Sequence, residues 1–111
     1  MVIANLHASG EARHPEVGAA EIARALAFVE SVAQPGDALV LAGDFNLSPN
    51  QLPELSGFSP PGPRIDHIFV RGAEASALEI WPEAHRTTAS GVLSDHAPVE
   101  LTVASPAASR P

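Results

Sequence analysis

The sequence contains no cysteine. Disulfide bonds and thiolate-bound zinc are therefore excluded, and any bound metal ion must be held by oxygen or imidazole ligands. Oxygen ligands suit hard cations such as Mg²⁺, Mn²⁺ or Ca²⁺. No stretch approaches the roughly 20 apolar residues that span a bilayer, and the first residues show no signal-peptide pattern. We therefore expect a cytoplasmic protein.

Basic residues are also scarce. All six are arginines, against thirteen acidic residues, and the formal net charge is −7. Proteins that grip long duplex DNA normally present a basic face to its phosphates. Because no basic run occurs here, extended nucleic-acid binding by this segment alone is disfavoured, whereas a small phosphoester substrate is not.

The remaining composition is that of a folded protein. With 111 residues and a hydrophobic fraction of 45%, the chain can bury the core of one domain. We find no internal repeat and no linker. Residues 1–104 are therefore predicted to form one unit, followed by a Pro-rich tail, residues 105–111, which we predict to be disordered.

Hydrophobic spacing predicts an α/β fold. Apolar residues recur at 3–4 spacing from Gly18 to Ala33, which is typical of an amphipathic helix, and Pro15 lies where helices begin. Short apolar runs predict buried strands. These strands are Val2–Leu6, Ala38–Ala42, Ile65–Val70, Ser76–Trp81 and Ala97–Val103, with a loop at Leu47–Arg64.

Polar side chains that could take part in catalysis or metal binding follow or precede these predicted strands. They occur in four short motifs: Asn5-Leu6-His7, Gly43-Asp44-Phe45-Asn46, Ile65-Asp66-His67-Ile68 and Ser94-Asp95-His96-Ala97-Pro98-Val99. Ligands in α/β layers collect at strand ends, where loops converge over a rigid sheet. A carboxylate beside a buried strand also requires a metal ion or a charged partner.

Each motif alone has a simpler interpretation. Gly, Asp and Asn are favoured in any strand-to-loop turn, so Asp44 and Asn46 could be turn residues. Asp95 and His96 could cap the entry to the last strand. Asp66 could pair with Arg64 rather than orient a histidine. His67 alternates away from Asp66 and is expected to pack in the interior.

Taken together and in this order, the four motifs resemble the endonuclease/exonuclease/phosphatase superfamily, which includes DNase I-like nucleases and inositol-polyphosphate phosphatases. The resemblance runs from about Val2 to Val103. It implies an α/β fold of the DNase I-like type. In that fold this chain would form half of a four-layer α/β/β/α sandwich, one mostly antiparallel or mixed sheet with a covering helix.

The resemblance also implies a role for each motif residue, in a phosphoester hydrolase that uses Mg²⁺ or Mn²⁺. His7 matches a histidine that hydrogen-bonds the scissile phosphate, and Asp44 matches the aspartate that prepares the attacking water. Asn46 matches an asparagine that contacts phosphate and positions that aspartate. The metal ligand would be Asp95. His96 would contact the phosphoryl oxygens, and Asp66 would hold the His96 ring in place.

The family's full domain is roughly twice as long, and its first half supplies a glutamate that is a principal metal ligand. Only six residues precede His7, so neither that glutamate nor its strand is present. We expect this half to be inactive alone, and either to self-associate or to require the missing half.

The alternative is a non-catalytic remnant, or a module that needs a partner chain. A dinuclear calcineurin-like phosphatase fits poorly, because it needs more His, Asp and Asn clusters. The substrate class stays open among nucleic acid, phospholipid headgroups and small phosphoesters.

Overall fold

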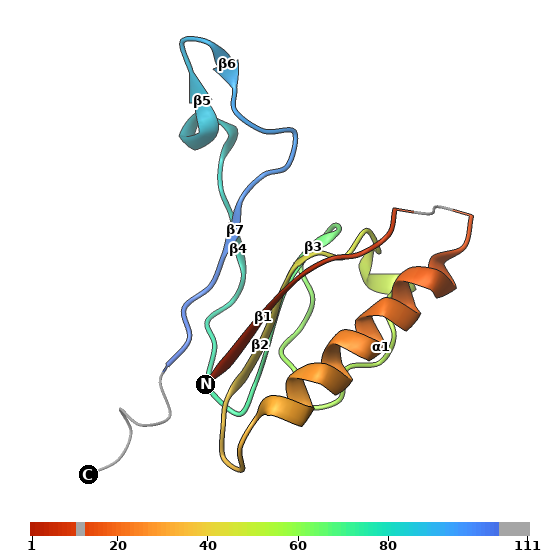
Figure 1. The fold of residues 1–111 in the computed structure, drawn as a ribbon. Coiled ribbons are helices and arrows are strands. Elements are labelled where there is room, and N and C mark those ends of the chain that lie inside the picture. Colours follow the sequence, from red (N-terminus) through yellow and green to blue (C-terminus); the bar gives the residue numbers. More distant parts are fainter. Residues whose placement is uncertain (11–12, 105–111) are drawn as a thin grey trace.

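A mixed three-stranded sheet with an α-helix along one face forms the centre of the computed structural model, which describes residues 1–10 and 13–104 (Figure 1). The strand order is β1-β2-β3, with β1 parallel and β3 antiparallel to β2. This arrangement confirms the predicted sheet and covering helix. The elements are β1 (Val2–His7), α1 (Pro15–Val32), β2 (Leu39–Asp44), η1 (Pro49–Gln51), β3 (Asp66–Arg71), β4 (Glu79–Ile80), η2 (Glu83–Arg86), β5 (Thr87–Thr88), β6 (Gly91–Val92) and β7 (Val99–Glu100).

The helix α1 connects the two parallel strands. Pro15 occupies its first turn, where a missing backbone N–H costs nothing, so the helix begins at Pro15, as predicted, and ahead of the apolar repeat that starts at Gly18. Ile22 and Val29 are buried against the sheet, as their spacing predicted. No helix in residues 1–10 and 13–104 is both long and apolar enough to cross a membrane.

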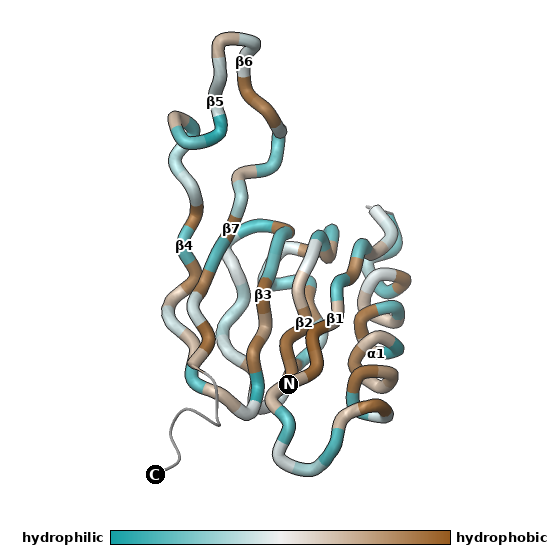
Figure 2. The backbone as a smooth tube through the Cα atoms, turned by 60° about the vertical axis from the view of Figure 1, so that its left-hand side comes forward, coloured by the Kyte–Doolittle hydropathy of each residue, from teal (hydrophilic) through white to brown (hydrophobic). Residues whose placement is uncertain are grey.

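The hydrophobic core lies between α1, the sheet and the start of the loop after β2. Figure 2 shows hydrophobic residues concentrated in β1, β2, β3 and α1. The loop contributes to the core because its first residues are apolar and turn inward. The buried cluster comprises Ile22, Leu41, Phe45, Leu47 and Phe69.

One histidine belongs to this interior. His67 is fully buried and stacks on Phe69, as its position in strand alternation predicted. Its Nδ1 atom accepts the Gly62 backbone N–H at 2.9 Å, and its Nε2 atom lies 2.8 Å from the Leu47 carbonyl oxygen. Because Nδ1 accepts, the ring is neutral and its proton is on Nε2. His67 therefore ties both ends of the long loop to the sheet.

The C-terminal segments are less regular than predicted. The predicted strands Ser76–Trp81 and Ala97–Val103 are reduced to the two-residue pair β4–β7 and one isolated bridge between Ala75 and Val103. They still run side by side, and they meet the main sheet where β7 contacts β3. Between them, the expected polar connection contains the small β5–β6 hairpin, which projects from the body (Figure 1). The predicted tail, residues 105–111, lies outside the described residues.

Candidate active site

Three of the motif residues form one row across an end of the sheet. His7 pairs with Asp44, and Asp44 pairs with Asp66. Laterally paired residues point to the same face of a sheet, so the three side chains are neighbours. The His7 Nε2 atom lies 3.6 Å from Asp44 Oδ2. His7 is 78% exposed and Asp44 only 21%, so the imidazole is open to solvent above a partly shielded carboxylate.

The turn after β2 fixes the orientation of Asp44. The backbone N–H of Asn46 donates to Asp44 Oδ1 at 2.9 Å, and the Asn46 amide donates to the Ala8 carbonyl oxygen at 2.6 Å. Asn46 has a φ of 52°, a conformation that asparagine tolerates better than most residues. Between them, Phe45 points into the core with no exposed surface. The turn is therefore anchored from inside while its two polar side chains face the site.

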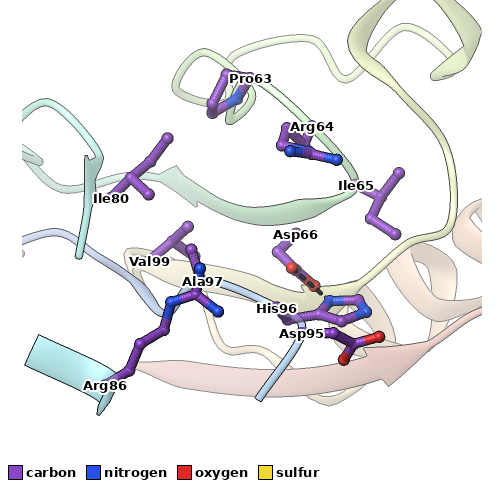
Figure 3. A pocket seen from close by; sticks show the side chains of 10 residues that line it. All are labelled: Pro63, Arg64, Ile65, Asp66, Ile80, Arg86, Asp95, His96, Ala97 and Val99. Atoms are coloured by element: carbon purple, nitrogen blue, oxygen red, sulfur yellow. Dashed lines mark hydrogen bonds and ion pairs between the residues drawn. The ribbon is translucent and has the colours of Figure 1, made fainter. Parts of the chain in front are cut away.

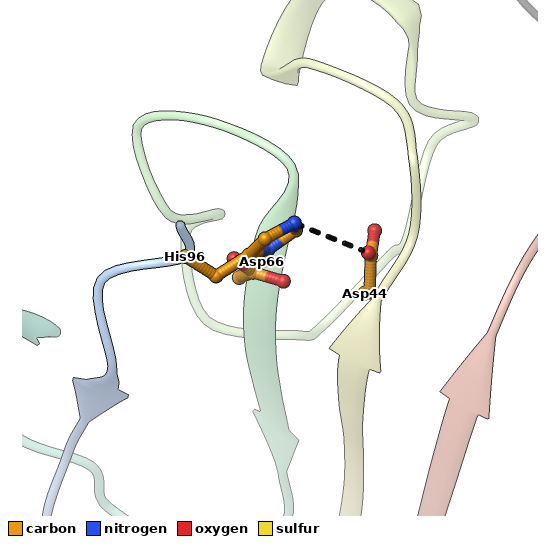
Figure 4. Close-up of side chains that lie close together, drawn as sticks. All are labelled: Asp44, Asp66 and His96. Carbon is orange, nitrogen blue, oxygen red and sulfur yellow. Dashed lines mark hydrogen bonds and ion pairs between the residues drawn. The ribbon is translucent and has the colours of Figure 1, made fainter. Parts of the chain in front are cut away.

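His96 lies between two carboxylates (Figure 4). Its Nδ1 atom is 2.8 Å from Asp66 Oδ2, and its Nε2 atom is 3.9 Å from Asp44 Oδ2. The hydrogen bond and charge of Asp66 raise the pKa of His96, and the charges of Asp44 and Asp95 act in the same direction. Asp66 thus pairs with His96, and this contact decides against its simpler pairing with Arg64. A raised pKa favours a cationic imidazole that can donate to an anion.

Changing Asp66 to asparagine is expected to lower the pKa of His96 toward its ordinary value. A raised folded-state pKa means that the stabilising contribution of His96 is present at low pH and is lost as the pH rises through that pKa. D66N should remove most of this pH dependence. An NMR titration of the imidazole measures it directly. Glu16→Gln, which neutralises the carboxylate beside the exposed His14, is the matched control and should leave His96 unchanged. An unaltered His96 titration in D66N would contradict the assignment.

Asp95 lies at the edge of the candidate site, next to His96. It is exposed and adjoins a pocket of about 130 Å³ next to His96 (Figure 3). The pocket combines charged and apolar side chains. It is lined by Pro63, Arg64, Ile65, Asp66, Ile80, Arg86, Asp95, His96, Ala97 and Val99. The structure thus brings His7, Asp44, Asp66 and His96 together, with Asp95 beside His96 at the pocket. Asn46 joins them through its backbone N–H, while its side chain bonds the Ala8 carbonyl oxygen.

The possible metal ligands differ from the predicted one. Asp44, Asp66 and His96 each offer an atom within 4.8 Å of the others. Carboxylate oxygens suit Mg²⁺ or Mn²⁺, so the donor chemistry fits a divalent cation. Asp66 and His96 already bond each other, however, which leaves Asp44 as the main available donor. These residues therefore fit a weak cation site, and the role of Asp95 as a ligand stays a prediction.

Two contributors were not anticipated from the sequence. Glu21 lies on α1, and its carboxylate accepts the Ser9 backbone N–H at 3.0 Å, just after β1. Hydrogen bonds from the Ser9 side chain and from its backbone N–H lower the pKa of Glu21, and they tie the loop after His7 to α1. Arg86 is half-buried and lines the pocket beside His96. Neither contact leaves a periodic signal in the sequence.

The matching family model is described as the endonuclease/exonuclease/phosphatase family, and it covers residues 9–96. The chain belongs to this family, as its motifs predicted. Among solved structures it is similar to TDP2 from Caenorhabditis elegans, at 16% identity and a TM-score of 0.71 over 92% of this chain. A truncated C. elegans TDP2 gives 16% identity and a TM-score of 0.70. No curated protein matches the sequence.

These likenesses establish the fold and also show how much of it is present. The chain spans 41% of the C. elegans TDP2 structure and 54% of the truncated one. It therefore spans about half or less of the length of those chains.

Proposed function

We propose that this chain supplies the phosphate-binding and water-activating side of a divalent-metal-dependent phosphoester hydrolase. The observation that supports it best is the convergence of His7, Asp44, Asp66 and His96 at one end of the sheet. Two imidazoles flank a carboxylate there, all of them accessible to solvent. Anion donors beside a general base are what hydrolysis of a phosphoester requires.

In the proposed reaction, His7 and His96 donate hydrogen bonds to the non-bridging phosphoryl oxygens. Asp44 accepts a proton as a water oxygen attacks phosphorus, and the bond to the leaving oxygen breaks in line with this attack. Asn46 keeps Asp44 aligned through its backbone N–H, and Asp66 keeps His96 protonated. A Mg²⁺ or Mn²⁺ ion, with Asp95 as its expected ligand, would neutralise charge that builds up on the phosphate.

Inorganic phosphate tests the binding half of this proposal. We expect phosphate to shift the imidazole NMR signals of both His7 and His96, because both face the same accessible space. His7→Gln should weaken binding by roughly tenfold, which is the usual loss for a hydrogen bond to a charged group. His14→Gln is the control, since His14 lies in an exposed pair with Glu16. Shifts confined to other histidines would contradict the assignment.

We do not expect catalytic turnover by the isolated chain, because about half of the length of the related structures has no counterpart here. We propose that the isolated chain needs a partner that supplies this half, or that it self-associates. Ile3 faces the same side of the sheet as the site row and is 69% exposed, which leaves an apolar group for such a contact. The competing proposal, a non-catalytic remnant, is favoured by the same missing half.

We expect no metal-dependent hydrolysis of bis(p-nitrophenyl) phosphate by the isolated chain with Mg²⁺ or Mn²⁺. Too few carboxylates surround the site to bind the ion tightly, and Mg²⁺ gives up its waters reluctantly. Size-exclusion chromatography with light scattering should accompany the assay. A stable monomer with turnover that disappears in Asp44→Ala would show that the chain is a complete enzyme and would overturn this proposal.

A further inference from the structure

The segment that carries Asp95 and His96 has almost no packing of its own. From Trp81 to Asp95, every residue except Arg86 is exposed. The hairpin within it consists of two-residue strands, β5 and β6, and it projects from the body of the molecule (Figure 1). A two-stranded hairpin without a hydrophobic face is at best marginally stable in water. The orientation of His96 therefore needs another source of order.

Arg86 makes the contacts that could supply this order. Its carbonyl oxygen accepts the Leu93 backbone N–H at 2.9 Å, which closes the base of the hairpin. Its Nη1 atom donates to the carbonyl oxygen of Ser94, while its Nε atom is shielded from solvent and has no hydrogen-bond partner. Withdrawing a charged guanidinium from water is unfavourable, and strong hydrogen bonds to its partners offset this. Those partners are the residues directly before the site.

The contacts continue from Ser94 to the site. The Ser94 hydroxyl oxygen accepts the His96 backbone N–H at 3.1 Å, and the His96 ring then bonds Asp66. Arg86 also lines the same pocket as Asp66, Asp95 and His96 (Figure 3). A continuous set of hydrogen bonds therefore joins Arg86 to the imidazole without direct contact between them.

We propose that Arg86 is a positioning residue, which holds the 94–96 segment against the sheet so that His96 faces Asp66 and Asp44. The inference rests on the proposed function, because it assumes that the orientation of His96 matters for phosphate binding. It predicts that the order of this segment depends on Arg86 whether or not the chain hydrolyses anything. Arg86 acts through Ser94 and need not touch substrate.

The test uses the 111-residue chain with Arg86→Ala, Arg86→Lys and the control Arg64→Ala. Arg64 lines the same pocket and carries the same charge, but it lies just before β3 rather than in the hairpin. The readout is the ¹⁵N signature of the His96 ring at one alkaline pH where it is neutral. A neutral ring bonded to Asp66 carries its proton on Nδ1, whereas a free ring distributes it between both nitrogens. Backbone ¹⁵N relaxation of residues 94–96 gives their order independently.

In Arg86→Ala we expect the detached form of the 94–96 segment to rise roughly tenfold, as for the loss of one charged hydrogen bond. The Nδ1–H signature should fade and β1–β3 should stay unchanged. Arg86→Lys retains a charged donor and should restore part of the order, and Arg64→Ala should resemble the wild type. The proposal is overturned if Arg86→Ala keeps the wild-type signature, if Arg64→Ala has the same effect, or if β1–β3 loosens equally. If Arg86→Ala does not fold, Arg86→Lys decides: intermediate order supports the proposal, and wild-type order overturns it. Phosphate binding is not used, so failure here is separate from failure of the proposed function.

Discussion

Gly43→Ala is expected to destabilise the chain strongly. A Cβ at this position would lie 1.9 Å from the Leu6 carbonyl oxygen and 2.9 Å from Asn5 Oδ1, on the paired strand. The φ of 142° at Gly43 adds backbone strain. Because the nearest obstacle is backbone, β1 would have to separate from β2. We expect a loss of at least ~3 kcal/mol, a large part of the ~5–15 kcal/mol that stabilises small domains.

The matched control is Gly36→Ala. Gly36 also has a positive φ, +86°, but nothing lies within 4 Å of its added Cβ. This variant carries only the conformational cost of about 1–2 kcal/mol. Urea denaturation followed by circular dichroism compares the two variants. Equal losses would mean that strain alone explains the effect, and that the close approach of β1 and β2 beside the site is unimportant.

Phe45→Ala is expected to cost about 3–5 kcal/mol, the usual range for a large buried aromatic side chain. Phe45 has no exposed surface, and its ring packs 5.4 Å from Phe69 and 5.5 Å from His67 between centroids. It also lies between Asp44 and Asn46, so the cavity should release the turn that orients them. Broadened NMR signals at Asn46 would report this second effect.

Phe28→Ala provides the comparison for the same chemical change. Phe28 lies on α1 and is 67% exposed, so its removal should change the free energy of unfolding by no more than about 0.5 kcal/mol. The same urea titration serves both variants. Similar losses at the two positions would show that the core is not centred on Phe45.

The central sheet and the helix were predictable because their signals are local. Ile22 and Val29 repeat at helical spacing, and the apolar run before Asp44 can only be buried on both faces. The C-terminal strands were overpredicted because β propensity cannot reveal how few partners a strand will have. The predicted Ala97–Val103 pairs with a segment that is itself short, and β structure remains only at Val99–Glu100 and at the bridge from Val103 to Ala75.

The candidate site likewise contains features that local sequence signals predicted and features that they did not. Strand alternation placed His67 inside, and the motif order placed His7, Asp44 and His96 near strand ends. Their mutual distances depended on register, which no single motif encodes. Arg86 could not be found, because a half-buried arginine among exposed neighbours leaves no pattern in the sequence.

The row of His7, Asp44 and Asp66 has a consequence for how the molecule folds. Its members come from strands far apart in the chain, and His96 reaches Asp66 across 30 residues. Contacts of this kind form slowly, because loop-closure entropy is lost before pairing brings any gain. The unfolded chain thus contains no local precursor of the site, which we expect to form only as the strands pair. A nascent chain interrupted before His96 would present the paired carboxylates without the imidazole that separates them.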